Sequence, residues 1–348
     1  MERWKSSDPL AASGPMKRRR RWTIPLLAAA GAMAGCMARS APPDKAELVL
    51  ERTIPLVGVA GRIDHLAYDA KRGRLFLAEL GNGSVEGVDL ATGRSIGRIG
   101  GLKEPQGLAF VPDRDELAVA SGGDGSVRFY RGADLVPSGV IQMGDDADNL
   151  RVDPTSGQLV VGYGAGALAV IDPVARRVTA TTPLPAHPEG FQLDGERAYV
   201  NVPDAGQTAV VHLPTGRMLT SWRNPGLKWN FPLAFDPVAG VVAIAYRFPA
   251  RLVVWTAASG QVRQSLGACG DADDLFFDKP RARIYVICGQ GVVDVFAATP
   301  NGYSRTARVP TRGGARTGLF VPQLDRLFVA ARAGPSAPAA LLVYRPQP

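Results

Sequence analysis

Residues 62–80 read RIDHLAYDAKRGRLFLAEL, and residues 271–289 read DADDLFFDKPRARIYVICG. Both stretches hold a short apolar segment, a turn marked by Asp, a basic residue and then a longer apolar segment. Short runs of β-branched and aromatic residues between turn residues are typical of β-strands. Each stretch therefore predicts two antiparallel strands joined by a tight turn.

The same pattern returns five more times in the chain, at 104–122, 146–164, 187–204, 230–247 and 314–332. The position just ahead of the first strand falls at Asp64, Gln106, Asp148, Glu189, Phe231, Asp273 and Arg316. Successive copies are separated by 42, 42, 41, 42, 42 and 43 residues. A constant period of this length predicts a repeat architecture rather than several unrelated domains.

Each copy continues with a Gly-rich turn, a third strand, a second turn and a fourth strand, as in the run GNGSVEGVDLATGRSIGRIG of residues 81–100. Four antiparallel strands in about 42 residues make one propeller blade. The seventh copy lacks its fourth strand, and the apolar run AELVLERTIPLVG at 46–58 can supply it. We therefore predict an all-β fold over 46–348: a seven-bladed β-propeller whose last blade is closed by an N-terminal strand.

The residues ahead of this domain have the features of a signal peptide, which we assign to 1–35. A basic run at 17–21 precedes an apolar stretch at 23–35 that is too short to span a membrane. The residues before Met16 have no recognisable feature, so 1–15 can be an over-extended start. The sequence predicts an exported protein of the periplasm or cell envelope.

The last three residues of the signal peptide and the next residue, Cys36, read Met-Ala-Gly-Cys, which resembles the bacterial lipobox. This resemblance implies that Cys36 is lipidated and anchors the protein to a membrane, with 36–45 as a tether. Secretion without a lipid is the alternative. Residues 1–35 hold seven basic and two acidic residues, so the rest of the chain carries only +3 of the net charge of +8. We therefore expect no nucleic-acid partner.

Several segments resemble one known family. VDLATGRSIGRI at 88–99, HLPTGRMLTSW at 212–222 and the strands RLFVA and RIYVICG are similar to the YncE-like, YVTN-type seven-bladed propellers of exported bacterial proteins. The resemblance covers the chain that follows the signal peptide. It implies the fold and leaves the function open, because propellers serve as enzymes, scaffolds and binding proteins.

In a propeller, the segments ahead of the inner strands meet at one rim of the central channel, where ligands of this architecture tend to bind. Carboxylates stand at four of the seven equivalent positions, and a ring of them can hold a divalent cation or a cationic ligand. The candidate metal ligands are Asp64, Asp148, Glu189 and Asp273. The candidate ligand-binding residues of the rim are Asp64, His65, Gln106, Asp148, Asn149, Glu189, Trp229, Phe231, Asp273, Asp274 and Arg316.

Simpler interpretations of the same residues stay open. The repeated Asp can be a turn residue that accepts backbone N–H groups. Trp229 and Phe231 can be a stacking platform or part of the packing between blades. His65 and His187 can be polar surface residues. No nucleophile motif is present, so no catalytic residue is assigned.

Cys269 and Cys288 form an even pair in a chain predicted to be exported, which favours a disulfide. Both approach the same rim of the sixth blade, although a strict hairpin register leaves them about three residues out of step.

The sequence thus predicts a monomeric, lipid-anchored propeller that binds an unknown protein or small-molecule ligand without catalysis. The alternative is a metal-dependent lyase or hydrolase with its site at the channel mouth and a divalent cation as cofactor. The third possibility is a structural scaffold whose rim binds no small ligand.

Overall fold

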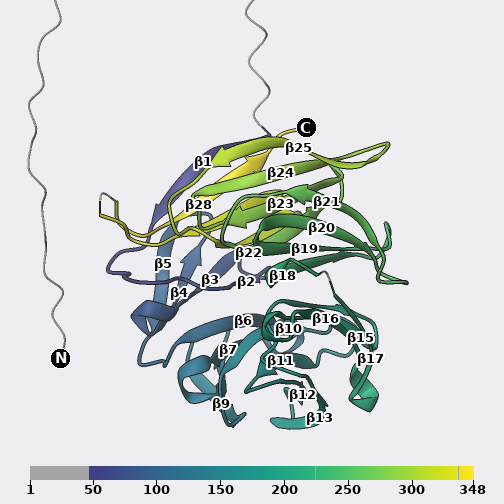
Figure 1. Ribbon diagram of the computed structural model, residues 1–348. Coiled ribbons are helices and arrows are strands. Elements are labelled where there is room, and N and C mark those ends of the chain that lie inside the picture. Colours follow the sequence, from purple (N-terminus) through teal and green to yellow (C-terminus); the bar gives the residue numbers. More distant parts are fainter. Residues whose placement is uncertain (1–46, 224, 336) are drawn as a thin grey trace, which may run out of the picture. The chain divides into compact units, whose positions relative to one another are not determined.

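The fold is built from four-stranded antiparallel sheets. The structure is a computed structural model that describes residues 47–223, 225–335 and 337–348 (Figure 1). In these residues, 28 strands form seven sheets. The predicted signal peptide at 1–35, the predicted lipidation site Cys36 and the tether at 36–45 lie outside the described residues. The predicted all-β propeller of seven four-stranded blades is confirmed.

The strands of each blade follow one another from the inside of the ring to its outside. Blade 1 contains β2 (Leu66–Asp69), β3 (Arg74–Glu79), β4 (Ser84–Asp89) and β5 (Arg94–Ile99). Blade 2 contains β6 (Pro105–Val111), β7 (Glu116–Ser121), β8 (Ser126–Arg131) and β9 (Pro137–Gln142). Blade 3 contains β10 (Ala147–Val152), β11 (Leu159–Tyr163), β12 (Ala167–Asp172) and β13 (Arg177–Pro183). Blade 4 contains β14 (Phe191–Asp194), β15 (Arg197–Val202), β16 (Gln207–His212) and β17 (Arg217–Trp222).

The remaining blades repeat this order. Blade 5 contains β18 (Lys228–Asp236), β19 (Val241–Phe248), β20 (Ala250–Thr256) and β21 (Val262–Gly267). Blade 6 contains β22 (Ala272–Asp278), β23 (Arg283–Cys288), β24 (Val292–Thr299) and β25 (Gly302–Pro310). Blade 7 contains β26 (Thr317–Val321), β27 (Arg326–Ala331), β28 (Ala340–Pro346) and β1 (Leu48–Pro55).

Short 3₁₀ helices of three residues lie in the turns between strands. They are η1 (Leu80–Asn82), η2 (Pro112–Arg114), η3 (Gly122–Asp124), η4 (Pro203–Ala205), η5 (Leu213–Thr215) and η6 (Pro322–Leu324). In the described part of the chain, no helix has both the length and the apolar character needed to cross a membrane.

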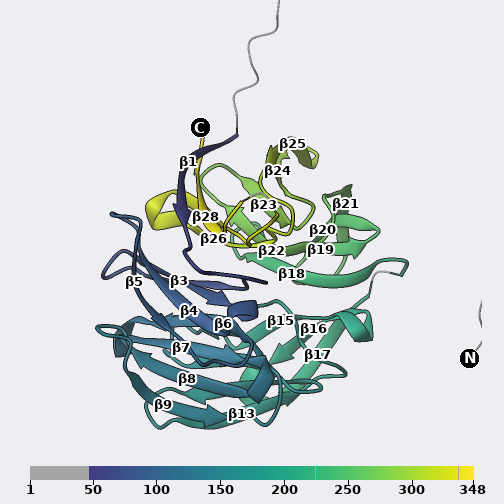
Figure 2. The ribbon, with the colours of Figure 1, turned by 90° about the vertical axis from the view of Figure 1, so that its left-hand side faces the viewer.

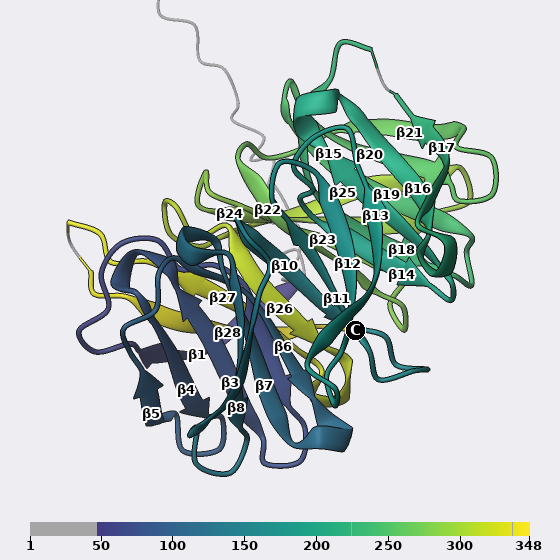
Figure 3. The ribbon, with the colours of Figure 1, turned by 90° about the horizontal axis from the view of Figure 1, so that it is seen from below.

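The ring closes through the innermost strands and through blade 7. Each inner strand contacts the inner strands of both neighbouring blades, and β26 of blade 7 contacts β2 of blade 1. Figure 3 shows β10, β22 and β26 towards the middle of the ring and the outer strands β5 and β21 at its edge. The N-terminal strand β1 pairs antiparallel with β28, and the two lie side by side in Figure 2. The predicted closure of the last blade is confirmed.

The second strands of the blades are among the most buried, and the outermost strands are the most exposed. All residues of β7 and β23 are buried, because the neighbouring blades cover both faces of these strands. Most residues of the outer strand β17 are exposed. Aromatic side chains join adjacent blades: Phe76 stacks on Phe110 with ring centroids 6.2 Å apart, and Trp222 stacks on Trp255 at 5.7 Å. Complete burial of such a side chain contributes about 1.5–3 kcal/mol.

Aspartates at the ends of inner strands fix the first turn of several blades. The Asp69 carboxylate accepts the backbone N–H groups of Lys71 at 3.0 Å and Arg72 at 3.2 Å. Asp236 accepts the N–H of Val238 at 3.0 Å in the same way. A side chain that satisfies these N–H groups stabilises the turn locally, so the second strand of the hairpin starts at a defined residue.

Cys269 and Cys288 form a disulfide with their Cα atoms 5.9 Å apart, which confirms that prediction. The cross-strand partner of Cys288 is Ala272, so Cys269 does lie three residues outside the hairpin register. Asp271 has φ of 59°, and its carbonyl accepts the N–H of Gly289 at 2.8 Å. This left-handed residue directs the preceding segment back over the end of the hairpin and brings the two sulfurs together.

Candidate functional site

The segments ahead of the inner strands enclose a cavity of about 360 Å³ at one end of the channel, which we call the mouth cavity. β-Bulges at the start of several inner strands turn its side chains inward. The register shifts between Ala147 and Leu150 in β10 and between Ala272 and Asp274 in β22. A residue inside a bulge is free of ladder pairing, so its side chain can face the channel. The mouth cavity is lined by Arg62, Leu80, Glu104, Gln106, Asp146, Asp148, His187, Glu189, Phe231, Arg247, Asp273 and Arg316.

Three arginines surround Asp273 on one side of the mouth cavity. Nη2 of Arg247 lies 2.5 Å and Nε of Arg316 2.9 Å from the Asp273 carboxylate, and Nη2 of Arg62 lies at 3.8 Å. Burial raises the pKa of Asp273, although the three guanidinium groups oppose this effect. The guanidinium of Arg247 also lies 3.7 Å above the ring centre of Phe231. This part of the site balances negative with positive charge.

A second set of buried ion pairs joins Arg62, Asp64, His65 and Asp274. Asp64 is 1% exposed, and its carboxylate lies 2.7 Å from Arg62. Burial raises the pKa of Asp64 to about 6, although His65 and Arg62 stabilise its ionised form. Nδ1 of His65 lies 3.5 Å from the Asp274 carboxylate, and Nε2 lies 3.8 Å from that of Asp64. Burial disfavours the imidazolium, but Asp274 and Asp64 outweigh this cost and raise the pKa of His65 to about 10.

The opposite side of the mouth cavity brings together Asp148, His187 and Glu189, with one ligating atom of each residue within 4.8 Å of the others. Nδ1 of His187 lies 2.7 Å from the Gly164 carbonyl, which can only accept, so this nitrogen carries the proton. Nε2 lies 3.7 Å from the Asp148 carboxylate. Burial opposes protonation of His187, but the Asp148 carboxylate and the Gly164 carbonyl raise its pKa to about 9.

Glu189 lies in surroundings that disfavour a negative charge, although His187 and Arg247 partly offset them. Burial raises its pKa to about 8, and the nearby Asp148 and Asp273 add to the shift. Among the described residues, no arginine lies within ion-pair distance of Glu189. Two acids and a histidine that donates Nδ1–H to a carbonyl are a ligand set that fits Zn²⁺ or Mn²⁺, provided that the metal displaces the proton from Nε2. Asp64 and Asp273, the other two carboxylates considered for a cation, pair with arginines instead.

The other residues that the sequence predicts for the rim lie at different places in the structure. Gln106 donates to Asp146 at 3.4 Å, and Arg316 pairs with Asp271 at 3.0 Å. Asn149 is buried in a narrow neck below the mouth cavity. Trp229 is half exposed and lies outside the lining of the mouth cavity. Its ring packs against that of Phe248 on the adjacent strand β19.

Most of the aspartates ahead of the inner strands do not act as turn residues. In the described residues, the side chains of Asp64, Asp148 and Asp273 accept no backbone N–H. Asp274 does accept one, at 2.8 Å from Gly318 of the next blade. The aspartates ahead of the inner strands therefore face the channel or link blades, and the aspartates at the ends of those strands stabilise the turns.

Similarity to known proteins is limited to the fold. The sequence matches no protein-family model and no curated protein. The WD40 repeats of RRP9 superpose with a TM-score of 0.75 at 12% identity, over 88% of this chain and 99% of that chain. A chain of the mitotic checkpoint complex gives 0.73 at 14% identity, over 92% and 99%. Kuenenia stuttgartiensis hydrazine synthase gives 0.67 at 16% identity, over 76% and 91%. These likenesses show a β-propeller.

Proposed function

We propose that this protein is an exported, lipid-anchored binding module of the cell envelope, whose mouth cavity takes a small ligand with a positively charged group and leaves it chemically unchanged. The charge distribution of the mouth cavity is the observation that carries the proposal. Around Asp273, three arginines offset the acids. Blades 2 to 4 contribute the carboxyls of Glu104, Asp146, Asp148 and Glu189 to the described lining, and His187 is the one cationic residue that they contribute.

A cationic group bound on this acidic side would relieve the repulsion that holds a proton on Glu189. Buried carboxylates without a counter-ion are costly, and an ammonium or guanidinium group of a ligand can supply that counter-ion. The volume of the mouth cavity is within the range of about 300–1,000 Å³ that small-molecule sites occupy. The similar propellers include a chain of the mitotic checkpoint complex, which supports binding of protein partners by such folds in general.

Thermal unfolding and calorimetric titration with a panel of cations test this proposal. The panel contains putrescine, choline, lysine and arginine, and acetate serves as an anionic comparison. A ligand at 100 times its dissociation constant stabilises the fold by about 2.7 kcal/mol. We expect stabilisation by at least one organic cation and its loss in Asp148→Asn. The exposed Asp204→Asn variant on η4 serves as the matched control and should bind like the wild type.

A second candidate function is metal-dependent catalysis, as a lyase or hydrolase, and the cluster of Asp148, His187 and Glu189 favours it. Its test uses EDTA followed by Ca²⁺, Mg²⁺, Mn²⁺ or Zn²⁺ in the same unfolding assay. A rise with one metal that is lost in His187→Gln, without a response to organic cations, would favour this candidate. No response to any cation would overturn both and favour a scaffold for protein partners.

The membrane anchor has its own test. We propose that Cys36 carries the lipid, with 1–35 removed as a signal peptide. Wild-type protein should then fractionate with membranes and Cys36→Ser should not. Equal membrane association of the two proteins would contradict the anchor and leave the binding proposal unaffected.

A further inference from the structure

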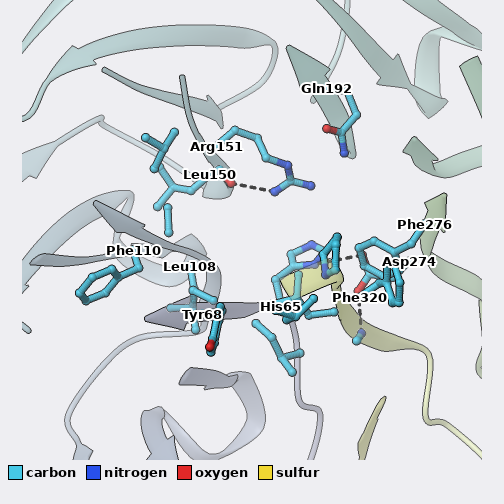
Figure 4. A pocket seen from close by; sticks show the side chains of 18 of the residues that line it. His65, Tyr68, Leu108, Phe110, Leu150, Arg151, Gln192, Asp274, Phe276 and Phe320 are labelled. Atoms are coloured by element: carbon cyan, nitrogen blue, oxygen red, sulfur yellow. Dashed lines mark hydrogen bonds and ion pairs between the residues drawn. The ribbon is translucent and has the colours of Figure 1, made fainter. Parts of the chain in front are cut away.

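A second cavity, which we call the channel cavity, lies further along the inner strands. Its volume is about 360 Å³, and it is open to solvent. The lining residues of the mouth cavity and the channel cavity do not overlap, and a neck of about 20 Å³ between them shares residues with both. Figure 4 shows the channel cavity with side chains from several blades converging on it. It is therefore a separate space from the proposed ligand site.

The walls of the channel cavity are mainly apolar. Apolar residues of the lining include Tyr68, Leu108, Phe110, Leu150, Phe276 and Phe320. Five polar residues line the same space: His65, Arg151, Gln192, Asp274 and the exposed Gln323. A mostly apolar pocket with a few converging polar groups is the usual form of a small-molecule site.

Arg151 is the side chain of the channel cavity that lacks a counter-ion. Its Nη1 donates to the carbonyl of the adjacent Leu150 at 2.7 Å, and its guanidinium lies 5.5 Å from the ring centre of Phe191. Among the described residues, no carboxylate lies within 4 Å of it. In Figure 4 the guanidinium extends into the cavity between Gln192 and the pair formed by His65 and Asp274.

The other arginines of the channel are all paired. Arg62, Arg247 and Arg316 each have an aspartate oxygen within 3 Å. Arg151 is therefore an exception, and burial lowers its pKa despite the more distant Asp274 and Asp148. Buried charges in proteins are normally paired, so an unpaired arginine in a cavity indicates the place of an anion.

Asp274 cannot serve as that partner, because its oxygens are already engaged. One oxygen lies 3.5 Å from Nδ1 of His65, and the other accepts the Gly318 N–H at 2.8 Å. Two cationic groups, Arg151 and His65, thus face one carboxylate. His65 also lies 3.8 Å from Asp64, so Arg151 is the cation of this cavity that has no carboxylate partner, which matches a ligand with one negative charge.

We propose that the channel cavity is a second binding site, which takes a small monocarboxylate with an apolar or aromatic body. The carboxylate pairs with the guanidinium of Arg151, whose planar fork fits two carboxylate oxygens. The Gln192 amide lies beside that position and can donate to the same group. The body of the ligand packs against the half-buried aromatic lining residues Tyr68 and Phe276. This site is independent of the mouth cavity and of the proposed function.

The test is a calorimetric titration of the protein with benzoate and hexanoate. Acetate and inorganic phosphate test whether charge alone is recognised, and benzylamine reverses the charge on the same ring. We expect benzoate or hexanoate to bind more tightly than acetate and phosphate, and benzylamine not to bind in the channel cavity. Saturation-transfer NMR on the wild type, with irradiation of protein methyl groups, should show contact with the benzoate ring.

Variants locate the binding site. Arg151→Gln should weaken binding about tenfold or more, because a charge-assisted hydrogen bond is lost. Arg151→Lys should retain part of the affinity. Arg217→Gln, on the exposed outer strand β17, is the matched control and should bind like the wild type. Three results would each overturn the proposal: no binding of either larger carboxylate to the wild type, equal binding of acetate or phosphate, or unchanged affinity in a folded Arg151→Gln protein.

Discussion

At the scale of single residues, Asp273 and Glu189 show how one repeat position acquires two electrostatic roles. They occupy equivalent positions in their blades. Asp273 lies among three arginines, and Glu189 lies close to Asp148 and His187. Burial and the neighbouring carboxylates raise the pKa of Glu189 to about 8, so it holds a proton at neutral pH. Groups with such displaced pKa values concentrate at functional sites.

The raised pKa of Glu189 predicts a stability that depends on pH. The unfolded residue ionises near pH 4.5 and the folded one near pH 8, so wild-type stability falls as the pH rises through this interval. Glu189→Gln cannot ionise. We expect it to gain stability relative to the wild type by up to about 1.4 kcal/mol per pH unit crossed. Urea unfolding of both proteins at about pH 4 and pH 9 measures the difference, and a constant difference would contradict the prediction.

His65 also has a raised pKa, but its charged form stabilises the folded protein, whereas the charged form of Glu189 destabilises it. Its folded pKa of about 10 exceeds the ordinary 6.5, so the contribution of its ion pairs is fully present below pH 6.5 and is lost as the pH rises through 10. His65→Gln should therefore be less stable than the wild type at neutral pH, and the two should converge at alkaline pH. His212→Gln, at the end of the third strand of blade 4, is the control. Parallel loss of stability at both ends of the pH range would indicate a packing defect instead.

The sequence predicted which residues lie at the rim, because the repeat determines their place in each blade. It did not predict in which direction their side chains point. The 42-residue period placed Asp148, Glu189 and Asp273 at one rim, because equivalent residues of the blades meet there. Arg247 was missed, since it comes from the end of a second strand and not from the segment ahead of an inner strand. The grouping of His187 with Asp148 depends on the exact path of two adjacent blades, which periodicity does not specify.

At the scale of strands and turns, the disulfide holds the segment that leads into β22. That segment carries Asp271 and Asp273, which pair with arginines from blades 5 and 7. A cross-link beside these residues limits the number of conformations open to them. The disulfide therefore links the stability of blade 6 to the geometry of the mouth cavity.

Removal of this cross-link should destabilise the protein measurably. For Cys269→Ser/Cys288→Ser we expect a loss of about 3 kcal/mol in the free energy of unfolding, mainly through the entropy of the unfolded chain. Amide exchange at 269–274 should become faster, while the outer strands of blade 2 remain unchanged. A reductant should weaken the wild type and leave the double variant unaffected. Equal numbers of reactive thiols in native and reduced wild-type protein would contradict the bond.

At the scale of the whole propeller, β1 completes blade 7 as its outermost strand and pairs with the outer side of β28. Unpaired strand edges are sites of aggregation, and this pairing covers the edge of β28. The paired strands lie almost 300 residues apart in the chain, as the partners Leu48 and Pro346 show. Such long-range pairing was predictable, since the seventh copy ended one strand short and 46–58 had the right pattern.

Deletion of 47–55 tests how far the fold depends on this strand. We expect the truncated protein to unfold at a lower temperature and to associate, because β28 then presents an open edge. Light scattering and thermal unfolding measure both effects. Leu50→Ser replaces a half-exposed residue of the same strand and is the control that should keep the association state of the wild type. A truncated protein with the association state and stability of the wild type would show that closure is dispensable.

The pairing of β1 with β28 also sets an order of events in time. β1 has to wait for β28 before blade 7 can form, so its backbone groups bond to water until the end of the chain is available. A prematurely terminated chain that lacks β28 cannot complete blade 7. Closure of the ring therefore requires both ends of the propeller domain.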